Sequence, residues 1–466
     1  MVSTKLKSVL GLLASGALLL SSGAHAAAQS SMPAPGLPAP GVPGSSLPGS
    51  LQPGGQSGSA QQAPGDAGDT KTLPQGTSDF TPLPSHPAPA PNRGLLVSQK
   101  VFAIAEGNGS GSATTQGLTA KKVTYRTTDS VGGQLTTSGV LTVPKQPWRG
   151  RGPRPLVAVA PGTQGVGKHC DASNAFRTGV QLRINPVDAV MPYEAVIVAP
   201  LLAAGYAVVA IDHPRDPHTG SQKYVDNIAS GQALIDAAAA SLQAMGAPKE
   251  TKVGFTGYSQ GGGAAGWAAE NVHRYAPELS VKASYVGAPP SDLMQVMRAV
   301  DGSLIAGVLA YATNQTLDNI PELREELEQQ ELSPLGLHTL RVNDSLCIAG
   351  SAFASGLADT RTMMRSRQSL MQVAHRYPQL LQALERQKLG QDHPRHPVLL
   401  GSGRHDDIIP HGQVTDVFHA WRSKGTPVRY RVDETPHLPG KLGINHMIPY
   451  MADLPHILAL FKRHLG

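Results

Sequence analysis

Residues 257–261, with the sequence Gly-Tyr-Ser-Gln-Gly, constrain the fold of this chain more than any other stretch. They follow an apolar, strand-like run at 252–256 and precede an Ala-rich, helix-like run at 262–275. A Gly-x-Ser-x-Gly sequence at such a junction is typical of a sharp strand-to-helix turn, which lifts the serine hydroxyl clear of the neighbouring chain. The sequence therefore predicts that Ser259 is a nucleophile.

The N-terminal part differs in composition from the rest. Two lysines, an apolar run at 9–20 and a small-residue cleavage site at 24–26 predict a secretory signal peptide at 1–26. Residues 27–93 are rich in Pro, Gly, Ser, Gln and Ala, a composition that buries too little apolar surface to fold and predicts a disordered linker. The linker is either a tether or a solvated tail. A secreted or periplasmic protein is expected, with its folded domain at 94–466.

Hydrophobic patterning predicts an α/β fold. Short apolar or β-branched runs predict strands at 101–105, 122–126, 138–143, 155–160, 207–211, 252–256, 281–286, 397–401 and 427–432. Helical spacing is found at 195–204, 227–245, 262–275, 413–424 and 453–464. Alternating strands and helices indicate a mostly parallel sheet with helices on both faces.

The interval at 291–396 is helix-like and shows no strand pattern. Inserted between two late strands, it would lie over the carboxyl ends of the sheet, where sites of α/β proteins form. We therefore expect a helical cap, with a purely structural helical extension as the alternative.

A serine nucleophile needs a base, and the base needs a carboxylate that fixes its tautomer. In folds with this serine turn, the acid and then the histidine follow later in the chain. Asp406 and Asp407 both come just after the strand at 397–401, and the one that is not the acid would be a cap or turn residue. His437 and His446 both follow the last strand, and His446 is preferred because it directly precedes the closing segment.

Acyl transfer also needs donors for the developing oxyanion. The backbone N–H of Gln260, at the start of the predicted helix, is one candidate. The loop after the strand at 155–160, which includes Thr163 and Gln164, is expected to supply the other, unless that loop is an ordinary turn.

Only two cysteines occur, Cys170 and Cys347. In an exported chain an isolated pair predicts a disulfide, with two buried free thiols as the alternative. No Cys or His cluster has zinc-ligand spacing, so neither a metal nor a cofactor is expected. The excess of basic residues is modest and spread along the chain, without a basic stripe interleaved with aromatics, which argues against nucleic acid as a partner.

Several motifs together resemble the secretory lipase family of α/β-hydrolases, which includes fungal lipase A and actinobacterial relatives. They are Gly-Tyr-Ser-Gln-Gly-Gly at 257–262, Pro-Gly-Thr-Gln-Gly at 161–165 with Cys170 after it, Asp-Asp-Ile-Ile-Pro at 406–410, and Asn445-His446. The likeness covers about residues 95–466. It implies an α/β-hydrolase fold, a helical lid similar to 291–396, Asp406 as the acid, and a bridge from Cys170 to Cys347.

The chain departs from the family at one place. Family members usually continue the first cysteine with Ala-Pro-Ser, whereas here Asp-Ala-Ser follows at 171–173. The expected function is a secreted serine hydrolase that cleaves lipid or other carboxylic esters and contacts lipid surfaces peripherally. Alternatives are a short-chain, aryl or polyester esterase, a peptidase with an acidic anchor at 322–331, and a binding module without catalysis.

Overall fold

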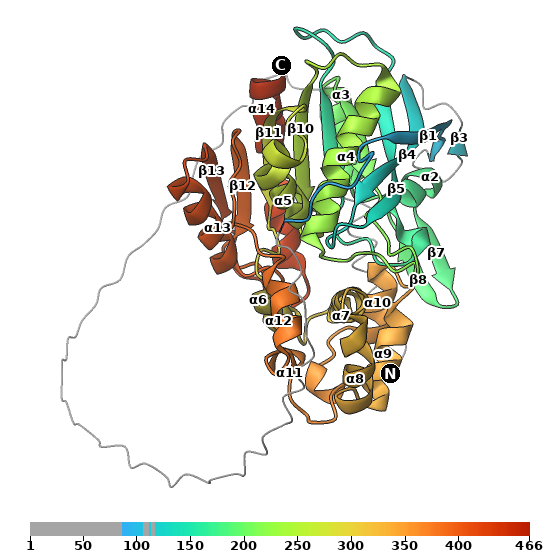
Figure 1. Cartoon of the computed structure of the whole chain (residues 1–466), viewed down its shortest axis with the longest axis vertical. Helices are drawn as coiled ribbons and strands as arrows, with labels where there is room; N and C mark the ends of the chain where they lie inside the picture. The colour runs from blue at the N-terminus through green and yellow to red at the C-terminus, as the bar shows by residue number, and fades with distance from the viewer. Residues whose placement is uncertain (1–85, 106–110, 113–116) are drawn as a thin grey trace, which may run out of the picture. The chain divides into compact units, whose positions relative to one another are not determined.

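The computed structural model describes residues 86–105, 111–112 and 117–466 (Figure 1). The predicted signal peptide at 1–26, and the predicted linker as far as residue 85, lie outside the described residues. Residues 86–93, assigned to the linker by composition, pack on the domain. Ala90 is buried and its N–H donates to Thr128 Oγ1 at 2.8 Å, and Arg93 pairs with Asp236 at 3.5 Å. The packed chain therefore begins before the predicted boundary at residue 94.

A nine-stranded sheet forms the centre of the domain. In spatial order its strands are β1 (Leu96–Val101), β4 (Leu118–Thr128), β5 (Gln134–Pro144), β9 (Ala207–Ile211), β6 (Leu156–Ala160), β10 (Lys252–Tyr258), β11 (Ser280–Gly287), β12 (Val398–Gly403) and β13 (Val428–Asp433). Neighbouring strands from β9 to β13 are parallel, whereas β1, β4 and β5 pair antiparallel at one edge. The strands β6, β9 and β12 are buried along their whole length, as expected for a parallel sheet covered on both faces.

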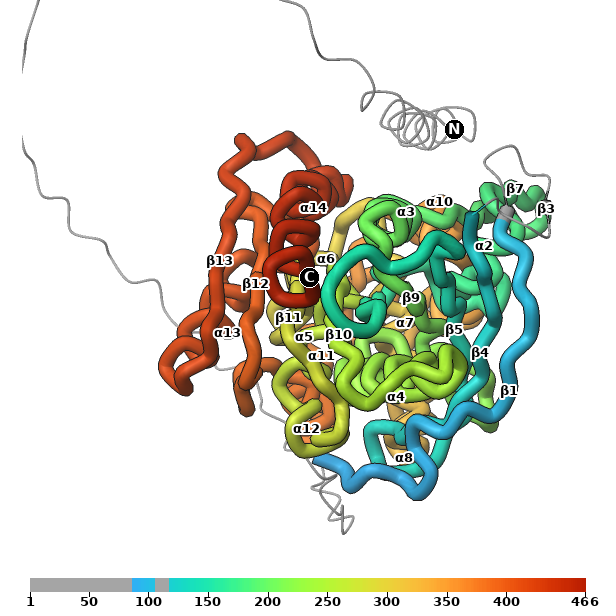
Figure 2. Tube along the Cα trace, turned by 90° about the horizontal axis from the view of Figure 1, so that it is seen from above, coloured from blue at the N-terminus to red at the C-terminus, as the bar shows by residue number. Residues whose placement is uncertain are grey.

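Helices cover both faces of the sheet. α4 (Asn227–Met245) and α5 (Gln260–Tyr275) lie on one face, and α3 (Ala195–Ala203) and α14 (Ile444–Leu465) lie on the other (Figure 2). Small residues let α4 and α5 approach closely, because a Cβ added at Gly231 would lie 2.6 Å from the Trp267 ring. α13 (His411–Ser423) packs against β12 and β13, and α2 (Ala172–Thr178) packs against β5 and β9.

A helical cap is inserted between β11 and β12. Its elements are α6 (Leu293–Val300), α7 (Val308–Asp318), α8 (Pro321–Gln330), α9 (Pro334–Asn343), α10 (Ile348–Ser355), η2 (Thr360–Thr362), α11 (Leu370–Ala374) and α12 (Pro378–Glu385). Proline begins α8, α9 and α12, where its missing N–H needs no partner. Cap residues share one pocket with residues that follow β10 and β12, so the cap covers the carboxyl ends of the strands. The predicted sheet with an inserted helical cap is confirmed.

Two local predictions were wrong, and one element was missed. The run at 101–105 is not one strand, because β1 ends at Val101 and the short β2 (Ile104–Ala105) pairs with β3 (Gly111–Ser112) instead. The terminal helix begins at Ile444 rather than at residue 453, although it contains two prolines. The hairpin of β7 (Gln181–Ile184) and β8 (Val187–Val190) was not predicted.

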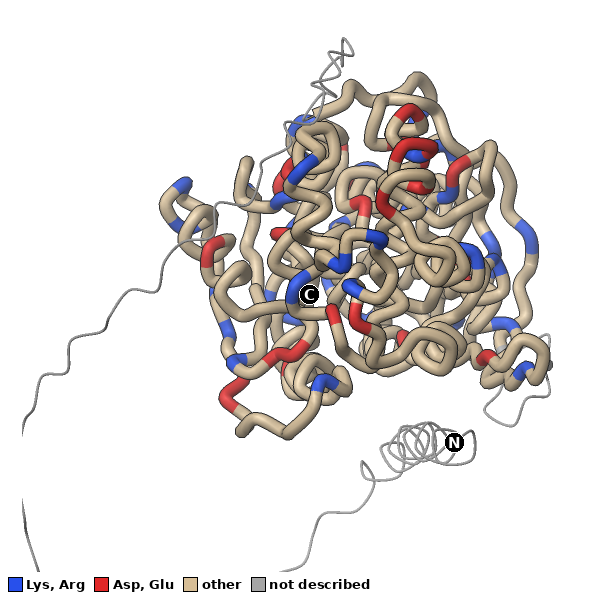
Figure 3. Tube along the Cα trace, turned by 90° about the horizontal axis from the view of Figure 1, so that it is seen from below, with Lys and Arg blue, Asp and Glu red and all other residues tan. Residues whose placement is uncertain are grey.

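Charged residues are dispersed over the described chain, with Lys and Arg interspersed among Asp and Glu (Figure 3). Within the described ranges, no helix combines the length and the apolar character that crossing a membrane requires.

Candidate active site

Ser259 lies in a strained turn between β10 and α5. Its backbone has φ 58° and ψ −124°, a conformation that L-residues rarely adopt and that clusters at functional sites. The turn is held because Ser259 N–H donates to Gly287 O at 2.9 Å. Only glycine fits on either side: a Cβ at Gly257 would lie 2.1 Å from Gly261 O, and one at Gly261 would lie 2.0 Å from Ala160 O. The turn predicted from the sequence is therefore present with its serine raised.

The structure brings His446 and Asp406 together. His446 Nδ1 lies 2.7 Å from Asp406 Oδ2, and a carboxylate accepts, so Nδ1 carries the proton and Nε2 is the basic nitrogen. The imidazole also lies beside the serine turn, because its ring centroid is 5.1 Å from that of Tyr258, whose hydroxyl donates to His446 O at 2.5 Å. His446 lies in the first turn of α14, not in the loop before the helix as predicted.

His446 Nε2 is buried and has no hydrogen-bond partner among the described residues. The bond to Ser259 Oγ that general-base catalysis requires is therefore not formed in this structure. Catalytic hydrogen bonds often tighten only once substrate is bound, and Nε2 has its lone pair available for that bond.

The two adjacent aspartates have different partners. Asp406 Oδ1 accepts from Ile408 N and Ile409 N at 2.9 and 2.8 Å, which leaves Oδ2 for the imidazole. Asp407 instead accepts from Gly443 N at 2.8 Å and His446 N at 3.1 Å. Asp407 thus caps the N-terminus of α14 from a distant part of the chain, where a carboxylate also favours the helix dipole.

His437, the other candidate base, is exposed. Its ring centroid lies 6.0 Å from that of His405, and it makes no hydrogen bond to a carboxylate of the described residues. The structure therefore places His446, and not His437, on the acid.

The predicted oxyanion donors are brought together only in part. α5 begins at Gln260, so the Gln260 N–H has no intrahelical acceptor. Thr163 lines the same pocket as Ser259 and Gln260, and its Oγ1 lies 2.9 Å from the Tyr224 hydroxyl. Gln164 is buried and does not line that pocket; its carbonyl instead accepts from Ile348 N at 3.0 Å. The geometry thus favours Gln260 and Thr163 over Gln164.

Residues 161–166, which we call the oxyanion loop, are held by side chains that sequence reasoning missed. Pro161 O accepts from His213 Nε2 at 2.8 Å, and Gly162 N–H donates to Glu194 Oε1 at 2.6 Å. Gly165 O accepts from Gln222 Nε2 at 3.1 Å. Donors fixed in this way need no reorganisation during the reaction. The position of His213 directly after β9 was the only sequence signal for any of these residues.

Burial sets the protonation of two of these groups. Desolvation lowers the pKa of His213 to about 4, although its bond to Pro161 O opposes this, so the imidazole is neutral near pH 7. Desolvation raises the pKa of Glu194 to about 7, opposed by hydrogen bonds from Gly162 N–H and the Tyr450 hydroxyl.

Glu194 also connects the two sides of the site. Its Oε2 accepts from the Tyr450 hydroxyl at 3.3 Å, and Tyr450 stacks on Tyr258 with ring centroids 4.4 Å apart. Tyr450 lies on α14, which carries His446, and Tyr258 precedes Ser259. One buried carboxylate therefore touches the oxyanion loop and the helix of the histidine.

Cys170 and Cys347 form a disulfide, as predicted, with Cα atoms 5.4 Å apart. The bond joins the chain just after the oxyanion loop to the start of α10 in the cap. Gly165 lies against the same point, because a Cβ there would be 2.3 Å from Cys347 Cα. His169 and Asp188 lie beside the bridge with possible metal-ligand atoms within 4.8 Å of one another, but the disulfide engages both sulfurs.

The sequence and the fold of this chain are similar to those of known proteins. Residues 181–465 match the family described as "Secretory lipase". The chain belongs to the secretory lipase family. The predicted class of carboxylic ester hydrolase, lipase or esterase, is confirmed at the level of this family.

Two relatives of this chain carry different names. The "Probable inactive lipase MT1628" of Mycobacterium tuberculosis (strain CDC 1551 / Oshkosh) is 26% identical over 326 residues, which is 68% of this chain and 69% of the relative. The "Secreted triacylglycerol lipase LIP4" of Malassezia globosa is 27% identical over 235 residues, 49% of this chain and 50% of the relative. This chain thus spans only about half the length of the second relative.

Solved structures confirm the α/β-hydrolase fold. Candida antarctica lipase A in its closed state is similar with a TM-score of 0.66 and 17% identity, over 81% of this chain and 84% of that one. The rice cell wall degrading esterase LipA from Xanthomonas oryzae is similar with a TM-score of 0.63 and 20% identity, over 80% of this chain and 100% of that one.

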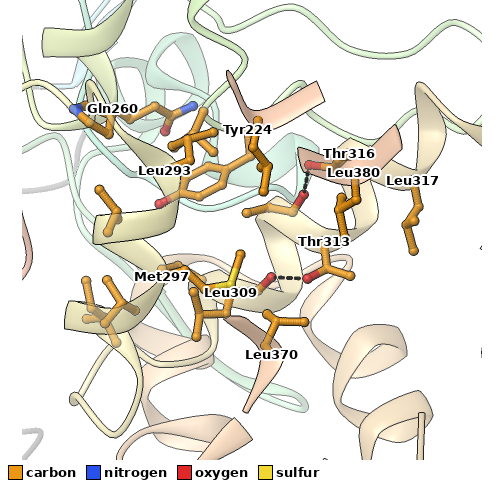
Figure 4. A pocket seen from close by; sticks show the side chains of 18 of the residues that line it. Tyr224, Gln260, Leu293, Met297, Leu309, Thr313, Thr316, Leu317, Leu370 and Leu380 are labelled. Carbon is orange, nitrogen blue, oxygen red and sulfur yellow. Dashed lines mark hydrogen bonds between the residues drawn. The ribbon is translucent and has the colours of Figure 1, made fainter. Parts of the chain in front are cut away.

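In this chain, a pocket extends from Ser259 into the cap (Figure 4). We call it the cap pocket; it is lined chiefly by apolar side chains, among them Leu293, Met297, Leu309, Leu317, Leu370 and Leu380. The Thr313 and Thr316 hydroxyls donate to Leu309 O and Ala312 O within α7, both at 2.7 Å, so their O–H hydrogens are already used. Thr163, Tyr224 and Gln260 line the pocket together with Ser259, Glu331 lines it in the cap, and most of the remaining lining is apolar.

Proposed function

We propose that this protein is an exported serine hydrolase that cleaves lipid esters with Ser259 as nucleophile, His446 as base and Asp406 as orienting acid. One observation carries the proposal: Asp406 holds the protonated Nδ1 of His446 at 2.7 Å, while the buried Nε2 has no partner among the described residues. That is the tautomer that a general base needs, because it leaves the lone pair on Nε2.

The proposed reaction has two halves. Ser259 Oγ attacks the ester carbonyl carbon while His446 Nε2 takes the hydroxyl proton, and the oxyanion is met by the Gln260 N–H and by donors of Thr163. The tetrahedral intermediate collapses, and the proton on Nε2 passes to the departing alkoxide. Water then attacks the acyl-enzyme, loses its proton to Nε2, and releases the acid as Ser259 recovers its hydrogen.

The cap pocket supports an apolar acyl group as the bound half of the substrate. Thr163 and Gln260 line it together with Ser259, where the ester group must be, and the part lined by the cap is mostly apolar, with many leucine and methionine side chains. A pocket of this kind binds by burial of apolar surface and orients by a few polar groups. One relative is named a triacylglycerol lipase, which agrees with lipid esters as the substrate class.

Covalent labelling tests the proposed roles. A fluorophosphonate probe is expected to label the mature protein and to lose its target in Ser259→Ala. Labelling is expected to fall sharply in His446→Ala and to persist in His437→Ala, the matched control on an exposed histidine. Labelling that depends on His437 instead would refute the assignment of the base.

A series of nitrophenyl esters tests the substrate class. We expect kcat/KM to rise with acyl length beyond four carbons, because each added methylene buried in the cap pocket contributes about 0.8 kcal/mol. A maximum at two to four carbons would instead favour the short-chain, aryl or polyester esterase.

Export is proposed from the leader at 1–26. Expression of the full chain in an export-competent host is expected to yield a protein whose N-terminus, by mass spectrometry, is residue 27. Recovery only of the uncleaved chain would contradict the proposal.

A further inference from the structure

The β7–β8 hairpin presents an apolar face to solvent. Its two strands pair antiparallel, with Leu182 opposite Ala189 and Ile184 opposite Val187. Cross-strand partners and residues two apart lie on the same face of such a pair, so Leu182, Ile184 and Val187 share one face. These side chains are 66%, 89% and 38% exposed. Val180 continues the alternation and is 61% exposed.

The other face of β8 packs on the domain. Asp188 and Val190 are buried, and the Asp188 carboxylate accepts from Cys347 N and Gly350 N, both at 3.0 Å, at the start of α10. The hairpin therefore has its carboxylate turned inward and its branched apolar side chains turned outward. This is the reverse of the usual pattern for a strand at the surface of a soluble domain, and contiguous exposed apolar residues mark interaction surfaces.

The exposed charged side chains of the hairpin and of the 13 residues just before it, 168–180, are all positive. From residue 168 to residue 187, the exposed charged side chains are Lys168, Arg177 and Arg183. Asp171, the carboxylate within this range, is not exposed and pairs with Arg215 at 2.5 Å. An apolar strip flanked by cations is complementary to a surface that is apolar in its interior and negatively charged at its boundary.

We propose that the β7–β8 hairpin docks this protein on lipid surfaces that carry anionic headgroups. Leu182, Ile184 and Val187 enter the acyl region, and Arg177 and Arg183 remain at the level of the headgroups. The choice of a lipid as occupant rests on the proposed function. Because Asp188 pins β8 to α10, docking brings the cap to the lipid surface along with the hairpin.

A second copy of the chain fits the same face poorly. A symmetric contact through this face would bring Arg177 and Arg183 close to their own copies, and like charges at such a contact are unfavourable. A lipid surface with anionic headgroups meets the same arginines with opposite charge.

Vesicle sedimentation tests the proposal on the full mature chain. The wild type is expected to bind phosphatidylglycerol vesicles more tightly than phosphatidylcholine vesicles. Leu182→Ser combined with Ile184→Ser is expected to lower the partition coefficient about tenfold or more, because two apolar side chains no longer leave water. Arg177→Gln and Arg183→Gln are each expected to lower it about fivefold, on phosphatidylglycerol only.

The matched control is Leu95→Ser combined with Val97→Ser. Both residues are 48% exposed and lie at the start of the sheet's edge strand rather than on the hairpin, so vesicle binding is expected to stay at the wild-type level. The hairpin variant is expected to keep wild-type kcat/KM on a water-soluble nitrophenyl ester, which separates a failure of docking from a failure of ester hydrolysis. Equal vesicle binding by wild type and hairpin variant overturns the proposal. A concentration-dependent dimer, lost in the hairpin variant and without vesicle binding, overturns it in favour of self-association.

Discussion

The two sides of the site are held in different ways. The histidine side consists of Asp406, Asp407 and His446, and its key contacts join these three residues to one another. The oxyanion loop at 161–166 is held instead by side chains from outside the loop, among them His213 and Glu194. The histidine side is therefore held by contacts among its own functional residues, whereas the loop depends on other buried groups, His213 and Glu194, whose pKa values burial shifts. This difference predicts how substitutions on each side change activity and stability.

The largest effect is expected on the histidine side. In Asp406→Asn the amide nitrogen can replace the oxygen that accepts from Nδ1–H, which favours the wrong imidazole tautomer and lowers kcat by about 10⁴-fold. Steady-state kinetics on a soluble ester measures this loss.

Asp407→Asn is the matched control for that prediction. It removes a cap from α14 but leaves the acid, so we expect about 0.5–2 kcal/mol lower unfolding free energy and a far smaller change in kcat. Equal losses of kcat in the two variants would mean that the aspartates do not divide their roles as the structure indicates.

The next effect concerns the connection between the oxyanion loop and the cap. Cys170→Ser is expected to lower the free energy of unfolding by about 2–5 kcal/mol, because the disulfide constrains the unfolded chain. The loop keeps its bonds to His213 and Glu194, so kcat at temperatures below the transition is expected to stay within a few-fold of wild type. Denaturant unfolding with and without reductant measures the first quantity. A large fall in kcat without a change in stability would show that the bridge positions the loop.

The smallest effect distinguishes the two sides by pH. Burial raises the pKa of Glu194 from 4.5 to about 7, so its contribution to stability is fully present below about pH 4.5 and is lost as the pH rises through 7. In Glu194→Gln the side-chain amide is neutral at every pH and has the same shape as the carboxyl group that it replaces. We therefore expect the variant to gain stability over wild type between pH 5 and 8, by up to about 3 kcal/mol, and to lose the part of the pH dependence of kcat near pH 7 that the ionisation of Glu194 causes.

Glu270→Gln is the control for that comparison. Burial raises the pKa of Glu270 to about 8, and its carboxylate accepts from Trp421 Nε1 and Gly390 N, away from the oxyanion loop. The free energy of unfolding of Glu270→Gln is expected to exceed that of wild type by an amount that grows as the pH rises to about 8. Its pH profile of kcat is expected to match that of wild type. A change in the pH profile of kcat in Glu270→Gln, but not in Glu194→Gln, would mean that Glu194 does not position the oxyanion loop.

The sequence predicted those parts of the molecule that short motifs encode. The serine turn at 257–261 needs glycine where strand, helix and neighbouring backbone meet, and that need is visible in the residue types. The alternation of strands and helices and the inserted cap follow from patterning. Asp406 could be preferred over Asp407 only through family likeness, because their different partners depend on where α14 begins.

The remaining parts depend on contacts between distant segments. Glu194 is a single acidic residue in an apolar stretch, and nothing local shows that Gly162 will donate to it. The start of α14 was misplaced because its cap, Asp407, comes from another loop. The hairpin at 181–190 breaks the usual alternation, with its apolar residues outward, so patterning could not place it.

The two adjacent aspartates have a consequence for how such proteins diversify. One fixes the ring of His446 and the other fixes the main chain of the same residue, so both ends of the segment at 408–442 are fastened at one point. Insertions, deletions or exchanges within that segment can then leave the separation of acid and imidazole unchanged. The arrangement allows this edge of the molecule to be rebuilt over evolutionary time around an unaltered pair.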